Sequence, residues 1–527
     1  MSRRATRGAP GPATGGPRPR ARARRAGRSV VAALVPLAAG ACVAASVPPG
    51  HAYVLAPVGV ALLAHANAGR PAGRRFAHGA TAGIAQFAFG LHWALQFTAF
   101  GYVALVVVEA AFVAVACAVA PGGRGRVAGL AAALVLGEWA RSSWPFGGMP
   151  IGGVALGQAG GPLVALARVG GPALVVAAVA LAGTAMEATG TAVARAARER
   201  DTRRLVAGVG PAIALVAVAA SAVLGAHAPD GGPVRGRLAV AAVQGGGRRG
   251  LSELDVPAAD VLAAQLAATS RLRPGAALVV WPEDSLSLAG PLRRSSAATL
   301  LGTVARRLDA TLVAGVTEPA GPRHFRNEVV AWSPSGRIVG TFEKVHPVPF
   351  GEYVPFRAEL SHLVSLAAVP RDAVPGHGTG ELSTPAARLA LLVSYETFFT
   401  GRGRSGVRAG GELVVVPTNT ASYASDAIPA QELAASRLQA VATGRDLVQA
   451  ASTGYSAIVD RRGAVVRRSA LGHPAIVLGT VELFDGLTCY DRFGDLPVLA
   501  LAAAALVASR AAGLARPRVR RPARRSA

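Results

Sequence analysis

Long runs of apolar residues, separated by short polar segments, occupy the first 230 residues and recur once near the C-terminus. Most runs approach the roughly 20 residues that a helix needs to cross a hydrocarbon core of about 30 Å. The pattern therefore predicts eight membrane-spanning helices, at roughly 29–47, 52–67, 77–97, 99–120, 126–140, 161–185, 205–227 and 494–513.

The first apolar run has a second interpretation. Residues 29–47 have the length of a signal peptide, and Ala39-Gly40-Ala41-Cys42 faintly resembles a lipoprotein processing box. Ala39 stands where such a box usually has leucine, and more apolar segments follow. We therefore expect this run to be retained as the first span.

Residues 235–485 have a different pattern, in which short apolar segments alternate with helical ones. Strands are predicted at Arg237–Val243, Ala277–Trp281, Thr311–Val316, Asn327–Trp332, Arg337–Phe342, Leu389–Ser394, Leu413–Pro417, Leu447–Ser452, Ser456–Val459 and Ala475–Val481. Helices are predicted at 254–272, 293–308 and 426–442. Because strands such as Leu413–Val416 are apolar throughout, they should be covered on both faces, which favours a layered α/β domain.

Composition agrees with a membrane protein. The 527 residues are 51% hydrophobic and 16% charged, and the mean hydropathy is +0.39. The net charge of +26 would suggest nucleic acid, but the arginines lie in short runs between apolar stretches, so we expect no nucleic-acid partner. Cys42, Cys117 and Cys489 match neither a disulfide framework nor a metal-ligand spacing, and we expect no metal and no cofactor.

The positions of the arginines predict the topology. Residues 1–28 carry nine arginines and no acid, which is typical of a disordered cytoplasmic tail. If the N-terminus is cytoplasmic, the basic loops lie on the same side, as the positive-inside rule requires; these arginines are Arg70, Arg74, Arg75, Arg124, Arg126, Arg195, Arg198, Arg200, Arg203 and Arg204. Seven crossings in 29–230 then place 235–485 on the extracytoplasmic side of the membrane, and the last span, 494–513, returns the basic tail 514–527 to the cytoplasm.

Lysine usage singles out one position. Lys344 is the only lysine among 55 basic residues, so arginine serves wherever surface charge is sufficient. An ammonium differs from a guanidinium in its compact charge and its adjustable pKa. A functional site is the more specific explanation of Lys344, and chance survival of one lysine codon is the alternative.

Three strand ends carry residues suited to catalysis. Glu283 follows the apolar segment Val279–Trp281, Lys344 follows Phe342-Glu343, and Ser394 follows Leu391–Val393. A carboxylate, an ammonium and a hydroxyl can act as general base, electrostatic stabiliser and nucleophile. Singly, a strand-end Glu is more often a solvated loop residue and a strand-end Ser is still less specific; the combination on three strands is harder to dismiss.

At these residues the sequence resembles the nitrilase-like hydrolase superfamily and, within it, the apolipoprotein N-acyltransferases of bacterial membranes. The most specific stretch is Phe342–Pro355, and Trp281-Pro282-Glu283 resembles the family's glutamate segment. Further matches are Gly137-Glu138-Trp139 with Arg141–Pro150, Asn327, Asn419 and Ala451–Ser456. The resemblance implies a membrane bundle of about eight helices joined to an αββα sandwich.

The resemblance also implies the chemistry. A fatty acyl chain would pass from a membrane phospholipid to the N-terminal amine of a diacylglyceryl-cysteine on an apolipoprotein, by way of an acyl-enzyme. By position, Glu283 would be the general base, Lys344 the oxyanion stabiliser, Glu352 a supporting carboxylate and Ser394 the residue at the nucleophile's place. Substrate-contacting residues would be Trp281, Tyr395, Glu396 and Asn419. We expect a monomer in the bacterial cell membrane.

The nucleophile position departs from the family, whose nucleophile is cysteine. A serine hydroxyl needs stronger general-base help than a thiol, whose reference pKa is about 8.5. Three interpretations stay open: a working serine variant, a degenerate paralogue, or a reading error at one codon. The rival functions are a catalytically impaired partner that binds membrane lipid or lipoprotein, and a membrane-tethered amidase acting on a small soluble amide.

Overall fold

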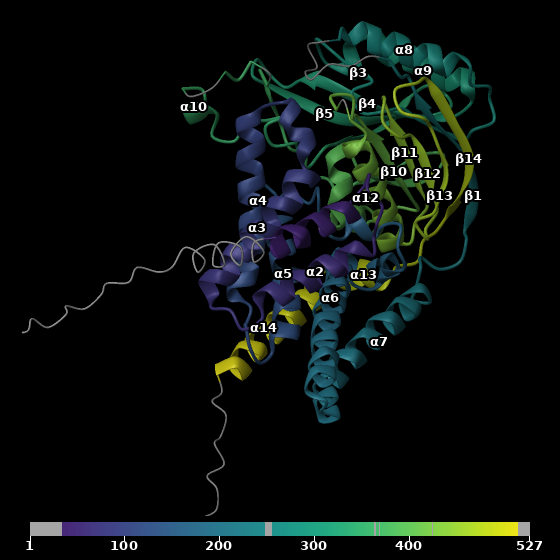
Figure 1. Cartoon of the computed structure of the whole chain (residues 1–527). Helices are drawn as coiled ribbons and strands as arrows, with labels where there is room; N and C mark the ends of the chain where they lie inside the picture. The colour runs from purple at the N-terminus through teal and green to yellow at the C-terminus, as the bar shows by residue number, and fades with distance from the viewer. Residues whose placement is uncertain (1–33, 248–255, 363–364, 368, 424, 515–527) are drawn as a thin grey trace, which may run out of the picture.

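The computed structural model describes residues 34–514 apart from 248–255, 363–364, 368 and 424. The expected tail at 1–28 and nearly all of the tail at 514–527 lie outside the described residues. The chain has a helical half, built from residues 34–226 and the last helices, and a half that contains the sheets (Figure 1).

The helical half contains the helix Leu34–Ser46 and then α2 (Leu55–Asn67), α3 (Ala72–Gly90), α4 (Ala99–Val119), α5 (Arg126–Arg141), α6 (Ala167–Glu199), α7 (Val206–Ala226) and, after the sheets, α13 (Cys489–Phe493) and α14 (Leu496–Leu514). Within the described residues, four helical segments are long and apolar enough to cross a membrane: Ala99–Val119, Pro162–Glu199, Thr202–Ala226 and Leu496–Leu514. The total of eight spans stays a prediction.

Two expected spans differ in detail from the helices that form. The run 77–97 is helical only to Gly90 and continues as a 3₁₀ turn, His92–Gln96. The run 161–185 begins as a 3₁₀ turn and is interrupted at Gly170 and Gly171, where Gly171 has φ +64°. Pro172 follows the break, and because proline has no backbone N–H, a helix tends to break there.

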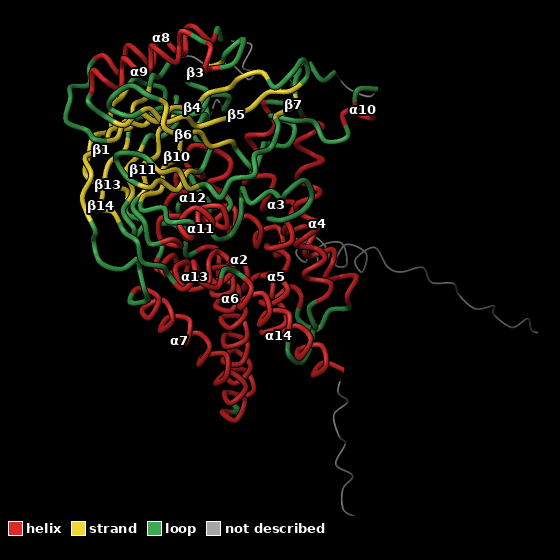
Figure 2. The backbone as a smooth tube through the Cα atoms, turned by 180° about the vertical axis from the view of Figure 1, so that it is seen from behind, coloured by secondary structure: helices red, strands yellow, loops and turns green. Residues whose placement is uncertain are grey.

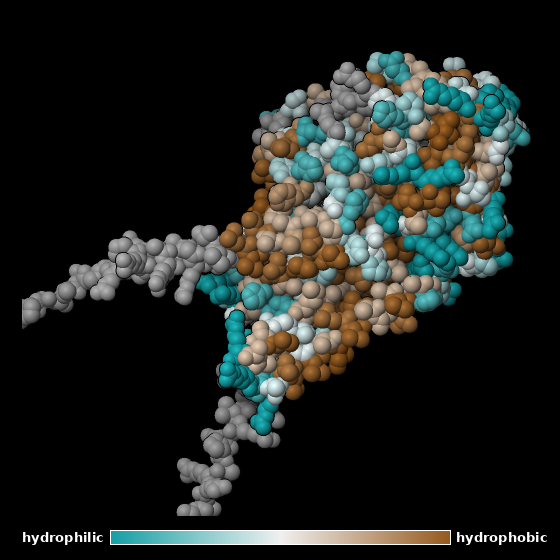
Figure 3. Space-filling model, turned by 45° about the vertical axis from the view of Figure 1, so that its right-hand side comes forward, coloured by the Kyte–Doolittle hydropathy of each residue, from teal (hydrophilic) through white to brown (hydrophobic). Residues whose placement is uncertain are grey.

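Apolar side chains form the outer surface of the helical half. On the face in Figure 3, hydrophobic residues make a nearly continuous surface over the helices, and hydrophilic residues are concentrated elsewhere. Val107 on α4, Val216 on α7 and Leu501 on α14 are each more than half exposed. Such a surface is expected of helices that contact lipid rather than water.

A buried charge cluster holds the interior of the bundle. The guanidinium of Arg141, at the end of α5, lies 2.5 Å from Glu109 of α4 and 2.9 Å from Glu138. It also donates to the carbonyl oxygen of Ile151 (2.6 Å), and its side chain is only 1% exposed. The cluster thus ties two helices to the loop that follows α5.

The other half is built on two sheets. The first has the order β14-β1-β2-β4-β5-β6, with β3 beside β4 and β7 beside β5; its strands are β1 (Gly236–Gln244), β2 (Leu278–Val280), β3 (Leu286–Ser287), β4 (Thr311–Pro319), β5 (His324–Trp332), β6 (Ile338–Glu343), β7 (Asp372–Ala373) and β14 (Ala475–Leu483). The second has the order β13-β12-β11-β10-β9-β8; its strands are β8 (Glu381–Ser383), β9 (Arg388–Leu391), β10 (Leu413–Thr418), β11 (Leu447–Ala451), β12 (Ala457–Val459) and β13 (Val465–Arg468).

The sheets pack face to face between two layers of helices (Figures 1 and 2). Val240, Val280, Leu391 and Val415 belong to the apolar core between the sheets. Helices α8 (Ala258–Ser270) and α9 (Ser296–Leu308) cover the first sheet, and α11 (Thr400–Arg408) and α12 (Ala427–Thr443) cover the second. The short α10 (Arg357–Leu360) lies in the loop between β6 and β7. These layers confirm the expected α/β sandwich.

Helix α12 joins the two halves. Its Leu433 packs on the second sheet, whereas its Leu438 and Val441 pack with Val175 of α6 in the bundle. Gln431 accepts a hydrogen bond from the N–H of Gly152 (2.9 Å) and donates to the carbonyl of Gly90 (3.1 Å). The sandwich is therefore seated on the bundle through one of its own covering helices.

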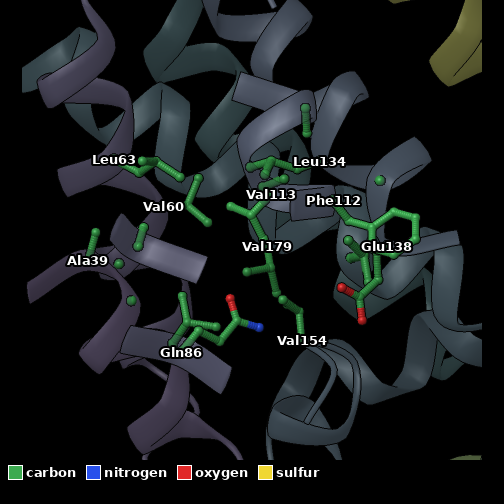
Figure 4. A pocket seen from close by; sticks show the side chains of 18 of the residues that line it. Ala39, Val60, Leu63, Gln86, Phe112, Val113, Leu134, Glu138, Val154 and Val179 are labelled. Carbon is green, nitrogen blue, oxygen red and sulfur yellow. The ribbon is translucent and has the colours of Figure 1, made fainter. Parts of the chain in front are cut away.

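A cavity of about 50 Å³ lies inside the bundle (Figure 4). Apolar side chains such as Val60, Leu63 and Val179 form most of its wall, and Gln86 and Glu138 are polar exceptions. A water molecule needs roughly 10–15 Å³ of such space, so the cavity has room for a few water molecules.

Candidate active site

Lys344 lies between two carboxylates. It follows β6, and its Nζ is 2.8 Å from Glu283 Oε1 and 2.8 Å from Glu352 Oε2. Glu283 follows β2, and Glu352 comes from the loop after Lys344. The Lys344 side chain is 2% exposed. The tertiary structure thus brings together three residues from two strand ends and a loop.

Asn327 of β5 holds both carboxylates in place. Its Nδ2 donates to Glu283 Oε1 (2.8 Å) and to Glu352 Oε1 (2.7 Å). Glu352 also accepts from the backbone N–H of Val348 (2.6 Å). Each carboxylate therefore has a fixed orientation before any substrate arrives, which is the preorganisation that catalysis requires.

The ammonium of Lys344 keeps its proton. Burial by itself lowers the pKa of this group, but the charges of Glu283 and Glu352 and their hydrogen bonds more than compensate, so the pKa is raised above its ordinary value. A permanently charged ammonium in a water-poor site is suited to stabilise an oxyanion.

Ser394 lies in a sharp turn rather than in the strand. Strand β9 ends at Leu391 and not at Ser394, because the chain enters a 3₁₀ turn, Ser394–Phe398. Ser394 has φ +50°, in the left-handed region that non-glycine residues rarely adopt. Strained backbone of this kind gathers at functional sites, and here it directs the hydroxyl away from the regular strand.

Glu396 connects the serine turn to the lysine loop. Its Oε2 accepts from the N–H of Val393 (2.9 Å). Its Oε1 accepts from the N–H groups of Val345 (2.9 Å) and His346 (3.2 Å). One buried carboxylate therefore binds the backbone immediately before Ser394 and immediately after Lys344. Its role visible in the structure is to position these two segments.

Thr418, at the end of β10, lies beside Ser394. Strands β9 and β10 are parallel neighbours, so their carboxyl ends meet at the same sheet edge. Thr418 Oγ1 is 3.3 Å from Ser394 Oγ and hydrogen-bonds to Oε1 of Glu432 on α12. Burial raises the pKa of Glu432 to about 8. Sequence reasoning identified neither Thr418 nor Glu432; the available signal was an acid within the helix predicted at 426–442.

Asn419 belongs to a neighbouring polar cluster. It donates to Asp284 Oδ2 (3.2 Å) and accepts from Ser452 Oγ (2.6 Å). Asp284 follows Glu283 directly, and burial, together with the charges of Glu283 and Glu352, raises the pKa of its carboxyl well above the ordinary value. Sequence reasoning also missed Asp284, which keeps Asn419 linked to the glutamate segment.

Trp281 and Tyr395, both predicted to contact substrate, have other surroundings. Trp281 is fully buried in the apolar core beneath α8 and α9, so the structure does not bring it together with the charged residues. The Tyr395 hydroxyl donates to the carbonyl of Gly148 in the loop after α5 (2.8 Å). Tyr395 therefore links the serine turn to the helical half.

Aromatic side chains line the boundary between the site and the bundle. Phe146, in the loop after α5, makes edge contacts with Phe350 and Phe356 at ring distances of 5.9 and 5.8 Å. Phe350 and Phe356 are 55% and 67% exposed. Nearby, His346 stacks on Phe399. Exposed apolar rings of this kind are typical of surfaces that contact another protein or a membrane.

A metal centre has no support in the described part of the chain, where no group of three or more His, Cys, Asp or Glu residues has metal-binding geometry. The candidate catalytic groups are the Lys344 ammonium, the Glu283 and Glu352 carboxylates and the Ser394 hydroxyl. This set matches acyl transfer through a nucleophile and an electrostatically stabilised oxyanion.

The fold and this residue set define a membrane-bound member of the carbon–nitrogen hydrolase class. The carbon–nitrogen hydrolase family matches residues 239–483, and the apolipoprotein N-acyltransferase N-terminal domain matches residues 39–185. An apolipoprotein N-acyltransferase of Bordetella bronchiseptica is 30% identical over 90% of this chain and 96% of that protein. The chain belongs to the apolipoprotein N-acyltransferase family.

Two further comparisons cover parts of the chain. An apolipoprotein N-acyltransferase of Geobacter metallireducens is 35% identical over 44% of this chain, and the match spans only 44% of that relative's length. A double mutant of the amidase from Nesterenkonia sp. AN1, solved in complex with acrylamide, is 23% identical with a TM-score of 0.37, covering 51% of this chain and 98% of the amidase.

Proposed function

We propose that this protein transfers a fatty acyl chain from a membrane phospholipid to the N-terminal amine of a diacylglyceryl-cysteine on an apolipoprotein. The observation that carries the proposal is the buried Lys344 ammonium held between Glu283 and Glu352 in a chain of this family. The name of the Bordetella relative supports the same activity.

The reaction has two halves. In the first, Ser394 Oγ attacks the ester carbonyl of the phospholipid, the lysophospholipid leaves with a proton, and an acyl ester forms on Ser394. In the second, the lipoprotein amine attacks that ester. Glu283 is the general base for the amine, and the proton that the amine loses returns to Ser394 Oγ as the amide forms.

Lys344 stabilises the negative charge on the carbonyl oxygen in both halves, and the backbone N–H of Tyr395 is the second oxyanion donor. Glu352 supports Lys344 through their ion pair. Glu396 and Asn419 position the surrounding segments through their hydrogen bonds. No cofactor takes part in this scheme.

The membrane supplies the acyl donor. Apolar helices hold the protein in the bacterial cell membrane, and the exposed apolar rings of Phe350 and Phe356 contact lipid beside the site. In the proposed topology both termini are cytoplasmic and the sandwich is extracytoplasmic, which is the side where the diacylated acceptor would be met. We propose that one chain is sufficient for the reaction.

Intact mass spectrometry tests the proposal directly. Purified protein in phospholipid vesicles should gain the mass of one fatty acyl chain, and Ser394→Ala should gain none. Addition of a diacylated lipopeptide should discharge the adduct and yield the triacylated form. Wild-type protein that never acquires the adduct and never converts the peptide would contradict the proposed activity.

The serine itself favours a second candidate, a catalytically impaired paralogue that binds lipid or lipoprotein. Ser394→Cys separates the two functions, because a thiolate attacks without strong general-base help. An adduct on Ser394→Cys and none on the wild type would establish the binding role. An adduct on both would establish a serine-dependent acyltransferase.

A further inference from the structure

Ser394 has a polar partner that no role assigned so far explains. Thr418 Oγ1 lies 3.3 Å from Ser394 Oγ and hydrogen-bonds to Glu432. In the described residues, no hydrogen bond joins Ser394 to Glu283 or Lys344. Glu283 Oε1 is already occupied by Lys344 and Asn327. The hydroxyl that must lose a proton therefore faces Thr418.

Glu432 is suited to receive a proton. It is 1% exposed, and its Oε2 has no hydrogen-bond partner in the described part of the chain. The charged and titratable groups that act on it or feel its charge are Glu283, Lys344 and Tyr423. A buried carboxyl with an unpartnered oxygen destabilises the fold. Structural packing alone does not explain a carboxyl that is separated from the nucleophile by only one side chain.

The direction of the hydrogen bonds depends on the protonation of Glu432. A hydroxyl carries one proton, so Thr418 cannot donate to both neighbours at once. When Glu432 is protonated, it donates to Thr418, and Thr418 donates to Ser394 Oγ. When Glu432 is ionised, Thr418 donates to the carboxylate and accepts from Ser394. Only the second arrangement draws the proton away from the attacking oxygen.

We propose that Glu432, acting through the Thr418 hydroxyl, receives the Ser394 proton during formation of the acyl-enzyme. This relay rests on the proposed acyltransferase function, and in it Glu432 acts through Thr418 without touching the substrate. It supplies the general-base help that a serine needs and a thiol does not.

The protons balance in this step. The Ser394 proton moves to Thr418 as the Thr418 proton moves to Glu432, and Ser394 Oγ forms a bond to the acyl carbon. When the tetrahedral adduct collapses, the bond from that carbon to the glycerol oxygen breaks. The glycerol oxygen then takes a proton from Thr418, which recovers one from Glu432, so Glu432 ends ionised.

The test compares isosteric substitutions in two backgrounds. In the Ser394 enzyme, Glu432→Gln and Thr418→Val should each slow adduct formation about 100-fold, the size of a general-base contribution, and Thr418→Ser should restore most of the rate. In the Ser394→Cys background, the same two changes should cost at most about tenfold. Ser436→Ala is the matched control, because Ser436 is a buried hydroxyl on the same helix that bonds Gln449.

The pH profile separates a relay from a merely structural role. Because burial raises the pKa of Glu432 to about 8, the ionised form accumulates as the pH rises through 8, and the acylation rate of the Ser394 enzyme should rise with it. Glu432→Gln should lose this rising limb. A structural role predicts a slower enzyme with an unchanged profile.

Each outcome decides between two hypotheses. If the wild type is acylated and Glu432→Gln is acylated equally fast, or with the same pH limb, the relay is refuted and the acyltransferase function stands. If neither the wild type nor Ser394→Cys forms an adduct, the proposed function fails and the relay fails with it. Equal losses of acylation rate in the Ser394 enzyme and in the Ser394→Cys enzyme would also refute the relay, since a thiol should depend on the relay far less than a hydroxyl.

Discussion

The ammonium nitrogen of Lys344 lies 2.8 Å from the Oε1 oxygen of Glu283, with the two side chains only 2% and 5% exposed. Together with Glu352, the group carries two negative charges and one positive charge in a nearly dry environment. Such a cluster is stable only while the cation is present, because an unpaired buried charge costs far more than an exposed one.

Lys344→Met should therefore damage both stability and activity. Breaking a buried ion pair costs about 3–5 kcal/mol, and loss of an oxyanion donor slows acyl transfer by about 100-fold or more. Because the pKa of Lys344 is raised in the folded protein, its stabilising effect is complete below its ordinary pKa and is lost only at strongly alkaline pH. Thermal unfolding should show the same deficit at pH 6 and pH 9.

Arg235→Met is the control for that measurement, since the Arg235–Asp485 pair has side chains 57% and 38% exposed. Exposed pairs contribute little to stability, because water and salt screen the two charges. Similar unfolding temperatures for Lys344→Met and Arg235→Met would contradict the assignment of a stabilising buried cluster.

Gly315→Ala should displace Glu283, the proposed general base, without touching its carboxylate. A Cβ atom at Gly315 would lie 2.6 Å from the carbonyl oxygen of Pro282 and in still closer contact with Cα of Glu283. The glutamate segment must move to relieve the clash, and a shift of about 1 Å in a catalytic group can cost about 100-fold in rate. Adduct formation and peptide acylation report the loss.

Gly401→Ala provides the comparison, because no heavy atom beyond its chain neighbours and its own helix backbone lies within 4 Å of the added methyl group. In helix α11 this change should raise stability slightly, by up to about 1 kcal/mol. The prediction fails if both alanine variants acylate the peptide at the wild-type rate.

Arg141 and Glu109 should be strongly coupled in the bundle. Arg141→Leu leaves Glu109 buried without its cation and should cost about 3–5 kcal/mol, whereas Arg141→Leu combined with Glu109→Leu should cost less than the two single changes added together. Unfolding of the detergent-solubilised variants gives the coupling free energy. Strict additivity would show that the 2.5 Å contact contributes nothing.

Glu432 should make stability depend on pH. Its pKa of about 8 in the folded protein is above the ordinary value of 4.5, so the folded state holds this proton more tightly than the unfolded state does. The stability that this tighter proton binding contributes is fully present below pH 4.5 and is lost as the pH rises through 8. Between pH 5 and pH 8, the wild type should lose about 1 kcal/mol per pH unit relative to Glu432→Gln.

Thermal unfolding of the wild type and of Glu432→Gln between pH 5 and pH 8 checks the sign and the slope of the difference in stability. Glu328, whose pKa burial raises to about 7, is present in both and cancels in the difference. Parallel curves for wild type and Glu432→Gln would mean that the pKa of Glu432 is not raised on folding.

Local signals in the sequence were sufficient for the layers and for part of the site. Apolar runs of helical length predicted helices near α4, α7 and α14, because hydrophobicity over about 20 residues is a property of contiguous sequence. The strand ends before Glu283 and Lys344 were predicted for the same reason. Lys344 was distinguished by being the only lysine in the chain.

The path of the backbone around Ser394 was beyond such reasoning. The apolar run predicts a strand through Ser394, but β9 ends three residues earlier, at Leu391. The turn is held by Glu396, which binds backbone N–H groups on both its own segment and the lysine loop. Those partners are about 50 residues apart in the chain, so only the folded protein brings them together.

The sequence by itself therefore determined the helical and sheet-containing parts of the chain, the strand ends before Glu283 and Lys344, and the family resemblance, because each depends on neighbouring residues. Only the tertiary structure decided that Trp281 is a core residue and that Asn327 binds the carboxylates of both Glu283 and Glu352. It also decided that Thr418 lies beside Ser394 and hydrogen-bonds to Glu432. Parallel strands and a covering helix bring these groups to one sheet edge, and contacts between distant segments leave no periodic signal in a single sequence.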